Sequence, residues 1–321
     1  MQHFSPLQPD IKERAAIEQA SRSGFYKCWA CGTCDGGCPV NINSHSLRPQ
    51  KIVRLAYIGL LDELLHLPEI WYCLTCRRCS QICPNLVKPC DIIGYVRREM
   101  LRRGIVSSDQ LHQYQQFFAK FQRVRWHAVS SCMDGCFDSL SDSQWNHWLS
   151  MPVPMLTSLI KRNGNPVLKL PGTDGRNANP SLCFTCSECS SACPVYCERG
   201  LFDPQAVVRM VNLGLVDELL VSPSIWLCLG CERCADTCPQ TVKAHQVISQ
   251  LRNMAISRNI VDLSFEYRLR QADRIIYPRF FKEIDAIFHL QTQENDHFNI
   301  DTGVAIGVPS QSPADSSALF H

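Results

Sequence analysis

Cysteine is the residue type whose number and spacing in this chain most plainly suggest chemistry. Sixteen of the 20 cysteines fall into four copies of the pattern C-x2-C-x2-C-x3-C, each followed at once by proline. We number these copies runs one to four: Cys28, Cys31, Cys34 and Cys38; Cys73, Cys76, Cys79 and Cys83; Cys183, Cys186, Cys189 and Cys193; Cys228, Cys231, Cys234 and Cys238. Thiolates at such short intervals are ligands for metal ions and for iron–sulfur clusters.

The spacing and the trailing proline favour [4Fe–4S] clusters over other thiol chemistry. The same run is found in bacterial ferredoxins. Two-residue gaps let one short loop surround three corners of a cubane, and the proline turns the fourth cysteine away. A zinc site needs only two C-x2-C pairs, and disulfides are typical of short secreted chains. A radical-SAM enzyme would show a single three-cysteine motif. We therefore expect four [4Fe–4S] clusters, with iron as the metal.

The fourth cysteine of each run is expected to bind the cluster of its neighbouring run, as in two-cluster ferredoxins. The expected ligands are Cys28, Cys31, Cys34 and Cys83 for cluster 1; Cys73, Cys76, Cys79 and Cys38 for cluster 2; Cys183, Cys186, Cys189 and Cys238 for cluster 3; Cys228, Cys231, Cys234 and Cys193 for cluster 4. Full cysteine ligation leaves no open iron for a substrate. The clusters would then transfer single electrons, and no catalytic residue is assigned.

The cysteine runs belong to a longer internal repeat. Runs one and three, and runs two and four, are each separated by 155 residues, and Val53–Pro84 matches Val208–Pro239 at 18 of 32 positions. Only five of these identities are motif cysteines or proline, so whole modules are duplicated. We expect a first module at 1–106, a linker with a helix at 107–177, a second module at 178–260, and a C-terminal helix with a disordered tail at 261–321.

The segments around the runs are predicted to be helical. The 34 residues between runs one and two carry apolar residues at near-helical spacing, with Gly59 ending a first helix and Asp62 opening a second. Further helices are expected at Asp91–Arg103, Asp109–Val129, Ala244–Arg258 and Phe265–Leu290. Pro278 is a candidate break in the last of these, and Asn163–Pro180 is expected to be a flexible connection. The fold class is therefore mainly α, with two tandem α-helical ferredoxin modules of two clusters each.

Other residues near the runs have two interpretations each. Trp71 and Trp226 stand two residues before a run and would either shield a cluster from water or pack in the core. Cys132 and Cys136 form a C-x3-C pair that is a redox dithiol or two unused thiols. Cys90 and Cys197 are likewise unassigned, and a fifth metal site among these four cysteines is a further alternative. The basic residues beside runs two and four would offset cluster charge, lie on the solvated surface or form a docking patch: Arg77, Arg78, Lys88, Arg233 and Lys243.

Composition excludes several other classes of protein. The net charge of +2 gives no sign of nucleic-acid binding. The most apolar stretch, Val207 to Cys231, contains Arg209, Asp217 and Glu218, so no membrane span is expected, although partners would allow peripheral association. No secretory signal is seen at the N-terminus. A soluble, cytoplasmic protein is therefore expected, where thiols serve metal or redox chemistry rather than disulfides.

The four runs and the helical gap between them resemble the C-type iron–sulfur subunit of heterodisulfide reductases. The likeness is carried by CWACGTCDGGCP and WYCLTCRRCSQICP in the first module, and by CFTCSECSSACP and WLCLGCERCADTCP in the second. It covers about half the chain. Members of that family typically carry one module, so the duplication is a departure. Similar modules are found in succinate dehydrogenase-type subunits, quinone-interacting oxidoreductases and benzoyl-CoA reductase complexes.

The resemblance implies a non-catalytic electron-transfer subunit of a multi-subunit complex. Such a subunit would pass electrons between a flavin-bearing A-like subunit and a CCG-bearing B-like or other catalytic subunit. The chain itself has no adjacent cysteine pair of the CCG type and no G-x-G-x-x-G nucleotide fingerprint. The alternatives are the iron–sulfur subunit of a quinone-interacting or benzoyl-CoA reductase complex, an enzyme using a Cys132/Cys136 dithiol, and a structural metal-binding module.

Overall fold

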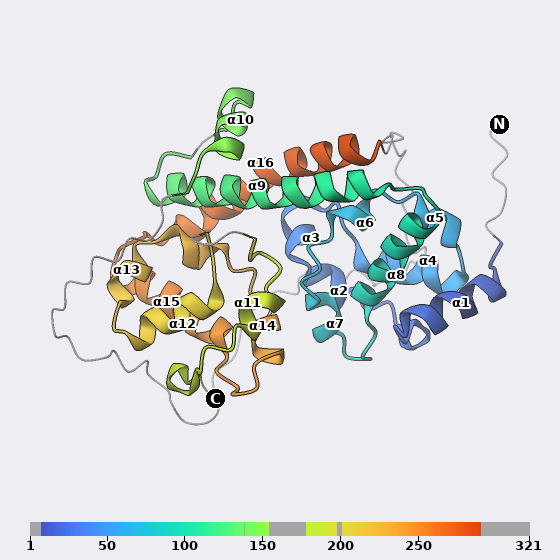
Figure 1. Cartoon of the computed structure of the whole chain (residues 1–321), viewed down its shortest axis with the longest axis horizontal. Helices are drawn as coiled ribbons and strands as arrows, with labels where there is room; N and C mark the ends of the chain where they lie inside the picture. The colour runs from blue at the N-terminus through green and yellow to red at the C-terminus, as the bar shows by residue number, and fades with distance from the viewer. Residues whose placement is uncertain (1–7, 138, 154–177, 198–200, 290–321) are drawn as a thin grey trace, which may run out of the picture. The chain divides into compact units, whose positions relative to one another are not determined.

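The regular structure of the chain is helical, as predicted (Figure 1). The computed structural model describes residues 8–137, 139–153, 178–197 and 201–289, and within these ranges there are α- and 3-10 helices but no β-strand. None of the helices in these ranges is both long and apolar enough to cross a membrane. The expected flexible connection lies outside the described residues except for its last three, and so does the tail from Gln291.

Each module consists of short helices around its two cysteine runs. The first contains α1 (Ile11–Ser21), η1 (Phe25–Lys27), α2 (Thr33–Gly36), α3 (Pro39–Ser44), α4 (Pro49–Ile58), α5 (Leu61–Leu65), α6 (Glu69–Tyr72), α7 (Arg78–Gln81) and α8 (Pro89–Arg102). The second contains η2 (Pro180–Leu182), α11 (Glu188–Ala192), α12 (Pro204–Asn212), α13 (Val216–Leu220), η3 (Pro223–Leu227), α14 (Arg233–Asp236) and α15 (Ala244–Ser257). Both modules lie in one compact unit that extends to Leu290, and the exact module boundaries stay a prediction.

The helices between the runs end where the sequence indicated. α4 begins at Pro49, whose fixed φ suits the first helical position. Gly59 follows α4 at a φ of +79°, and the corresponding Gly214 follows α12 at +76°. This left-handed conformation closes the helix by returning backbone N–H groups to its last carbonyls. The same helix–glycine–helix turn is therefore built twice, 155 residues apart.

Two longer helices, α9 (Ser108–Met133) and α16 (Phe265–Phe288), pack against each other along their length. α9 begins with a capping box in which Ser107 and Gln110 exchange side-chain and backbone hydrogen bonds, and it runs four residues past the predicted end. α10 (Asp142–Ser150) packs on α9.

α16 continues through Pro278, so the break suggested at that residue is absent. A proline inside a helix costs about 3 kcal/mol, but Tyr277, Phe280 and Phe281 beside it are buried. The apolar surface that these rings remove from water is enough to keep the helix continuous.

The packing of α9 on α16 is a run of aromatic contacts, which we call the α9–α16 seam. Phe121 stacks on Phe280 with ring centroids 4.1 Å apart, and Tyr114 meets Phe288 at 5.7 Å. Early residues of α9 thus meet late residues of α16, so the helices are antiparallel. Figure 1 shows the two lying side by side.

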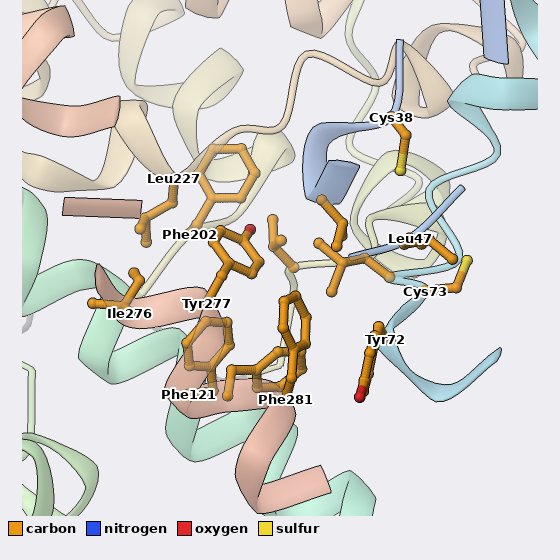
Figure 2. Close-up of a cluster of buried hydrophobic side chains, with 14 of the residues drawn as sticks. Cys38, Leu47, Tyr72, Cys73, Phe121, Phe202, Leu227, Ile276, Tyr277 and Phe281 are labelled. Carbon is orange, nitrogen blue, oxygen red and sulfur yellow. The ribbon is translucent and has the colours of Figure 1, made fainter. Parts of the chain in front are cut away.

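Residues of both modules pack on the seam. Figure 2 shows Leu47 and Tyr72 of the first module and Phe202 and Leu227 of the second around side chains of α9 and α16. The Tyr72 hydroxyl donates to Asp285 of α16 at 2.8 Å. The Arg125 side chain of α9 donates to the Leu227 carbonyl at 3.2 Å. The seam therefore ties the two modules into one core.

The paired glycines give a test of how closely α1 approaches α4. A Cβ added to Gly59 would lie 1.9 Å from the backbone oxygen of Asp10, whereas one added to Gly214 meets nothing within 4 Å. Gly214→Ala should cost about 1–2 kcal/mol, the penalty of a left-handed alanine. Gly59→Ala should cost clearly more, because α1 must also move. Thermal unfolding of the two variants checks this, and equal losses of stability would contradict the close approach.

Candidate cluster sites

All four cysteine runs have the same unusual backbone. In each, the second residue after the first cysteine and the residue just after the second cysteine have positive φ, between 53° and 76°. These residues are Ala30 and Gly32, Thr75 and Arg77, Thr185 and Ser187, and Gly230 and Glu232. Six of the eight are not glycine, and this conformation costs each of those about 1–2 kcal/mol. Such strain persists where the surroundings require it, which is typical of functional sites.

The left-handed turns aim backbone N–H groups at sulfur. The Ala30 N–H donates to the Cys28 Sγ atom, Thr75 N–H to Cys73 and Gly230 N–H to Cys228, each at 3.4 Å. Hydrogen bonds to cluster sulfurs are one of the means by which a protein sets a cluster's potential. These three runs therefore direct amide dipoles at thiols that are predicted to be ligands.

Three pockets lie inside the cysteine loops, and each is lined by cysteines of two runs. One is lined by Cys28, Cys31, Cys34 and Cys83; one by Cys183, Cys186, Cys189 and Cys238, with Cys234 also in its wall; one by Cys193, Cys228, Cys231 and Cys234. Their empty volumes are similar, about 350, 390 and 340 Å³. Each contains three cysteines of one run and the fourth cysteine of its partner run.

The fourth set, Cys38 with Cys73, Cys76 and Cys79, is also brought together. All four side chains are buried. Burial, followed by the neighbouring Cys73 and Cys38 thiolates, raises the pKa of Cys79 above its ordinary value. Burial likewise raises the pKa of Cys38 to about 11, with Cys73 adding to it. The four thiols are thus close enough to influence one another's ionisation.

This donor set fits a [4Fe–4S] cluster. Each group offers four soft thiolate ligands around a space, and the first cysteines of three runs also receive an amide hydrogen bond. Within the described residues, no three His, Cys, Asp or Glu side chains lie close enough together to hold a single metal ion. Burial raises the pKa of Cys34 to about 12, so loading a cluster requires the release of thiol protons.

An arginine anchors the start of runs two and four, which the sequence pattern did not reveal to us. The Arg97 guanidinium donates to the carbonyls of Ile70 and Cys73 at 2.7–3.0 Å. Arg252, 155 residues later, donates to Ile225 and Cys228 at 2.9 and 2.7 Å. The sequence signal that could have indicated this role is the arginine that recurs at the same repeat position of α8 and α15.

The two tryptophans pack beneath these arginines. Arg97 lies 4.9 Å from the ring of Trp71, which is 1% exposed and also stacks on Phe288. Arg252 lies 5.3 Å from Trp226, whose ring meets Phe265. Neither tryptophan lines any of the three pockets. Their packing is that of core residues joining the runs to the α9–α16 seam.

The three arginines of runs two and four have polar partners in the structure. Arg77 forms an ion pair with Asp91 at 3.0 Å. Arg78 pairs with Glu232 of the other module at 2.6 Å, and Arg233 donates to the Thr75 carbonyl at 3.0 Å. Two of these three therefore connect the modules.

The four remaining cysteines differ in their surroundings. Cys90 is buried and hydrogen-bonded to Cys73, which lowers the pKa of Cys73 and leaves the proton on Cys90. Cys132 is fully buried, and burial raises its pKa to about 11. Cys136 is exposed, and its thiol donates to the Asp134 carbonyl. Cys197 is exposed. Cys90 is thus in contact with a predicted ligand.

Comparison with protein families agrees with these sites. Residues 27–88 and 180–242 each match a family model described as a 4Fe-4S dicluster domain. The chain is therefore a mainly helical iron–sulfur protein with two dicluster domains.

Several curated relatives belong to one kind of reductase. The chain is 35% identical over 91 residues to the C subunit of the H(2):CoB-CoM heterodisulfide,ferredoxin reductase of Methanothermobacter thermautotrophicus, covering 28% of this chain and 49% of the relative. It is 39% identical over 77 residues to an iron-sulfur C subunit, numbered 2, of the CoB--CoM heterodisulfide reductase of Methanocaldococcus jannaschii, covering 24% and 40%.

A third relative, from Archaeoglobus profundus, is a protein described as like the C subunit of heterodisulfide reductase. It is 30% identical over 103 residues, which cover 32% of this chain and 55% of the relative. The chain thus spans about half the length of the curated relatives it matches. No solved structure matches it. More particularly, then, the matched part of the chain is similar to the C subunit of heterodisulfide reductases.

The arginine anchor predicts a change in redox potential. Arg97→Met removes a positive charge that stabilises the Cys73 thiolate, so the potential of the cluster bound there should fall, on the order of 60 mV for a tenfold change in a one-electron equilibrium. Arg97→Lys should lose the paired hydrogen bonds but keep most of the potential. Redox titration followed by EPR measures both, with Arg102→Met at the exposed end of α8 as the control. An unchanged potential in Arg97→Met would show that the charge has no influence.

Proposed function

We propose that this chain is an electron-transfer subunit that relays single electrons through four [4Fe–4S] clusters. Its place would be between a flavin-bearing subunit and a catalytic subunit of a heterodisulfide reductase-like complex, in the cytoplasm. The observation that carries the proposal is the composition of the pockets, each lined by three cysteines of one run and the fourth of the partner run. The likeness to the C subunits of heterodisulfide reductases supports the complex and its partners.

The chain's own residues would hold and shield the redox centres. When bound, each cluster supplies a reversible one-electron couple. The left-handed loops fix the sulfur positions in advance, and the buried apolar residues behind them, such as Val53 and Val208, limit contact with water. Arg97 and Arg252 fix the carbonyls at the start of runs two and four. Little needs to move when the charge changes, which favours rapid transfer.

The alternative of a Cys132/Cys136 dithiol enzyme is weaker. A reactive thiol needs a lowered pKa and access to solvent, whereas burial raises the pKa of Cys132. The iron–sulfur subunit of a quinone-interacting or benzoyl-CoA reductase complex would use the same clusters. Isolation of the native complex from its host would distinguish these alternatives from the leading proposal, because it would identify the partner subunits.

Metal analysis tests the cofactor content. Anaerobically purified protein should contain roughly sixteen iron and sixteen sulfide per chain, four clusters of four. Zinc with little iron would instead support the structural metal-binding module. A matched variant, Cys197→Ser, changes an exposed cysteine outside the predicted sets and should leave the iron content unchanged.

The crossed ligand sets predict which substitutions act on the same cluster. Cys83→Ser and Cys28→Ser should alter one and the same EPR signal, because both residues are assigned to cluster 1. Cys73→Ser should alter a different signal. In the second module, Cys238→Ser should act together with Cys183→Ser. If Cys83→Ser changes the signal affected by Cys73→Ser, each run binds its own cluster and the crossed assignment is wrong.

A further inference from the structure

Runs two and four face each other across the boundary between the modules. Arg78 reaches Glu232, Arg233 reaches the Thr75 carbonyl, and Gln81 hydrogen-bonds to Asp236. All three contacts join α7 and its run to α14 and its run. We call this set of contacts the junction.

The junction has the geometry of a two-fold interface. Gln81 and Asp236 are 155 residues apart and so occupy equivalent positions of the two modules. Arg78 and Arg233 are also equivalent, and each reaches into the opposite run. Contact between equivalent positions is the mark of an interface formed by two copies of one surface. The modules therefore meet through the same face.

The second cysteines of the facing runs differ in exposure from those of runs one and three. Cys76 and Cys231 are again equivalent positions. Both are buried, whereas the corresponding Cys31 and Cys186 of runs one and three are exposed. The sites of runs two and four are thus covered by the junction, and those of runs one and three open to solvent.

Within each module the two runs pack against each other through equivalent helices. In the first module α2, which contains Cys34, packs against α7, which contains Cys79. In the second module α11, which contains Cys189, packs against α14, which contains Cys234. Cys234 also lines the pocket of run three. The neighbouring sites therefore form a series, from one to two, two to four and four to three.

We propose that electrons cross between the modules at the junction, directly between the centres held by runs two and four. This rests on the proposed function. Numbered by their runs, the centres would be visited in the order 1, 2, 4 and 3, so the order of the runs along the chain is not the order of electron transfer. One electron leaves the centre on one side, which is oxidised, and reduces the centre on the other; no proton or third reactant is needed. Runs one and three, with exposed Trp29 and Phe184 beside their first cysteines, are the two ends that meet partner proteins.

Magnetic coupling between reduced clusters tests the path without any enzyme assay. In the full chain, Cys31→Ala with Cys186→Ala should leave clusters 2 and 4, which should show mutual spin coupling by EPR. Cys76→Ala with Cys231→Ala should leave clusters 1 and 3, which should show two independent signals. The reverse pattern, or coupled signals in both variants, would overturn the path. Iron analysis of the unaltered chain, if far below four clusters, would instead reject the proposed function itself.

A second set of variants leaves every predicted ligand in place. Arg78→Glu sets a carboxylate against Glu232 and should weaken the coupling between clusters 2 and 4. The exchange Arg78→Glu with Glu232→Arg should restore it. The matched control is Arg102→Glu, since Arg102 pairs with Glu99 inside its own module and should leave the coupling intact. Coupling that is unchanged in Arg78→Glu, or equally lost in the control, would contradict the role of the junction.

Discussion

The stacking of aromatic side chains between α9 and α16 is the interaction on which the rest of the structure depends. Phe121 and Phe280 lie at its centre, and both modules pack against it through Tyr72 and Leu227 (Figure 2). Each module is a small set of mostly short helices around its two cysteine runs. Because small cores are marginal, a shared core between duplicated modules both stabilises the loops and sets their separation.

The chemistry of the chain was predictable because its signals are local. Three ligands of each proposed cluster lie within seven residues, and the proline after the fourth cysteine indicates a change of chain direction. Helix ends were equally local, as at Gly59, where a helix end was expected and found. Comparison of the two halves of the sequence predicted the helical modules, because residues that recur after 155 positions indicate structure that both halves share. The family matches confirmed an iron–sulfur protein with two dicluster domains, and the structure confirmed a mainly helical fold.

What the sequence did not predict depends on contacts between distant residues. Nothing near Arg97 says that its guanidinium will reach the Cys73 carbonyl 24 residues earlier, although the repeat of this arginine at Arg252 was a usable hint. Cys90 contacts Cys73 only because α8 folds back on run two. The continuity of α16 through Pro278 was hidden for the same reason, since local propensity argues for a break and only the packed aromatic rings outweigh it.

Joining two copies in one chain also removes a restriction that symmetry places on a pair of identical subunits. In a homodimer, residues at equivalent positions must be the same, so a face that meets itself cannot carry opposite charges at those positions. Here the position after the second cysteine is Arg77 in one half and Glu232 in the other, and Gln81 faces Asp236. After duplication, each side of such a contact can change by substitution on its own, and the two halves can come to surround their metal centres with unequal charge.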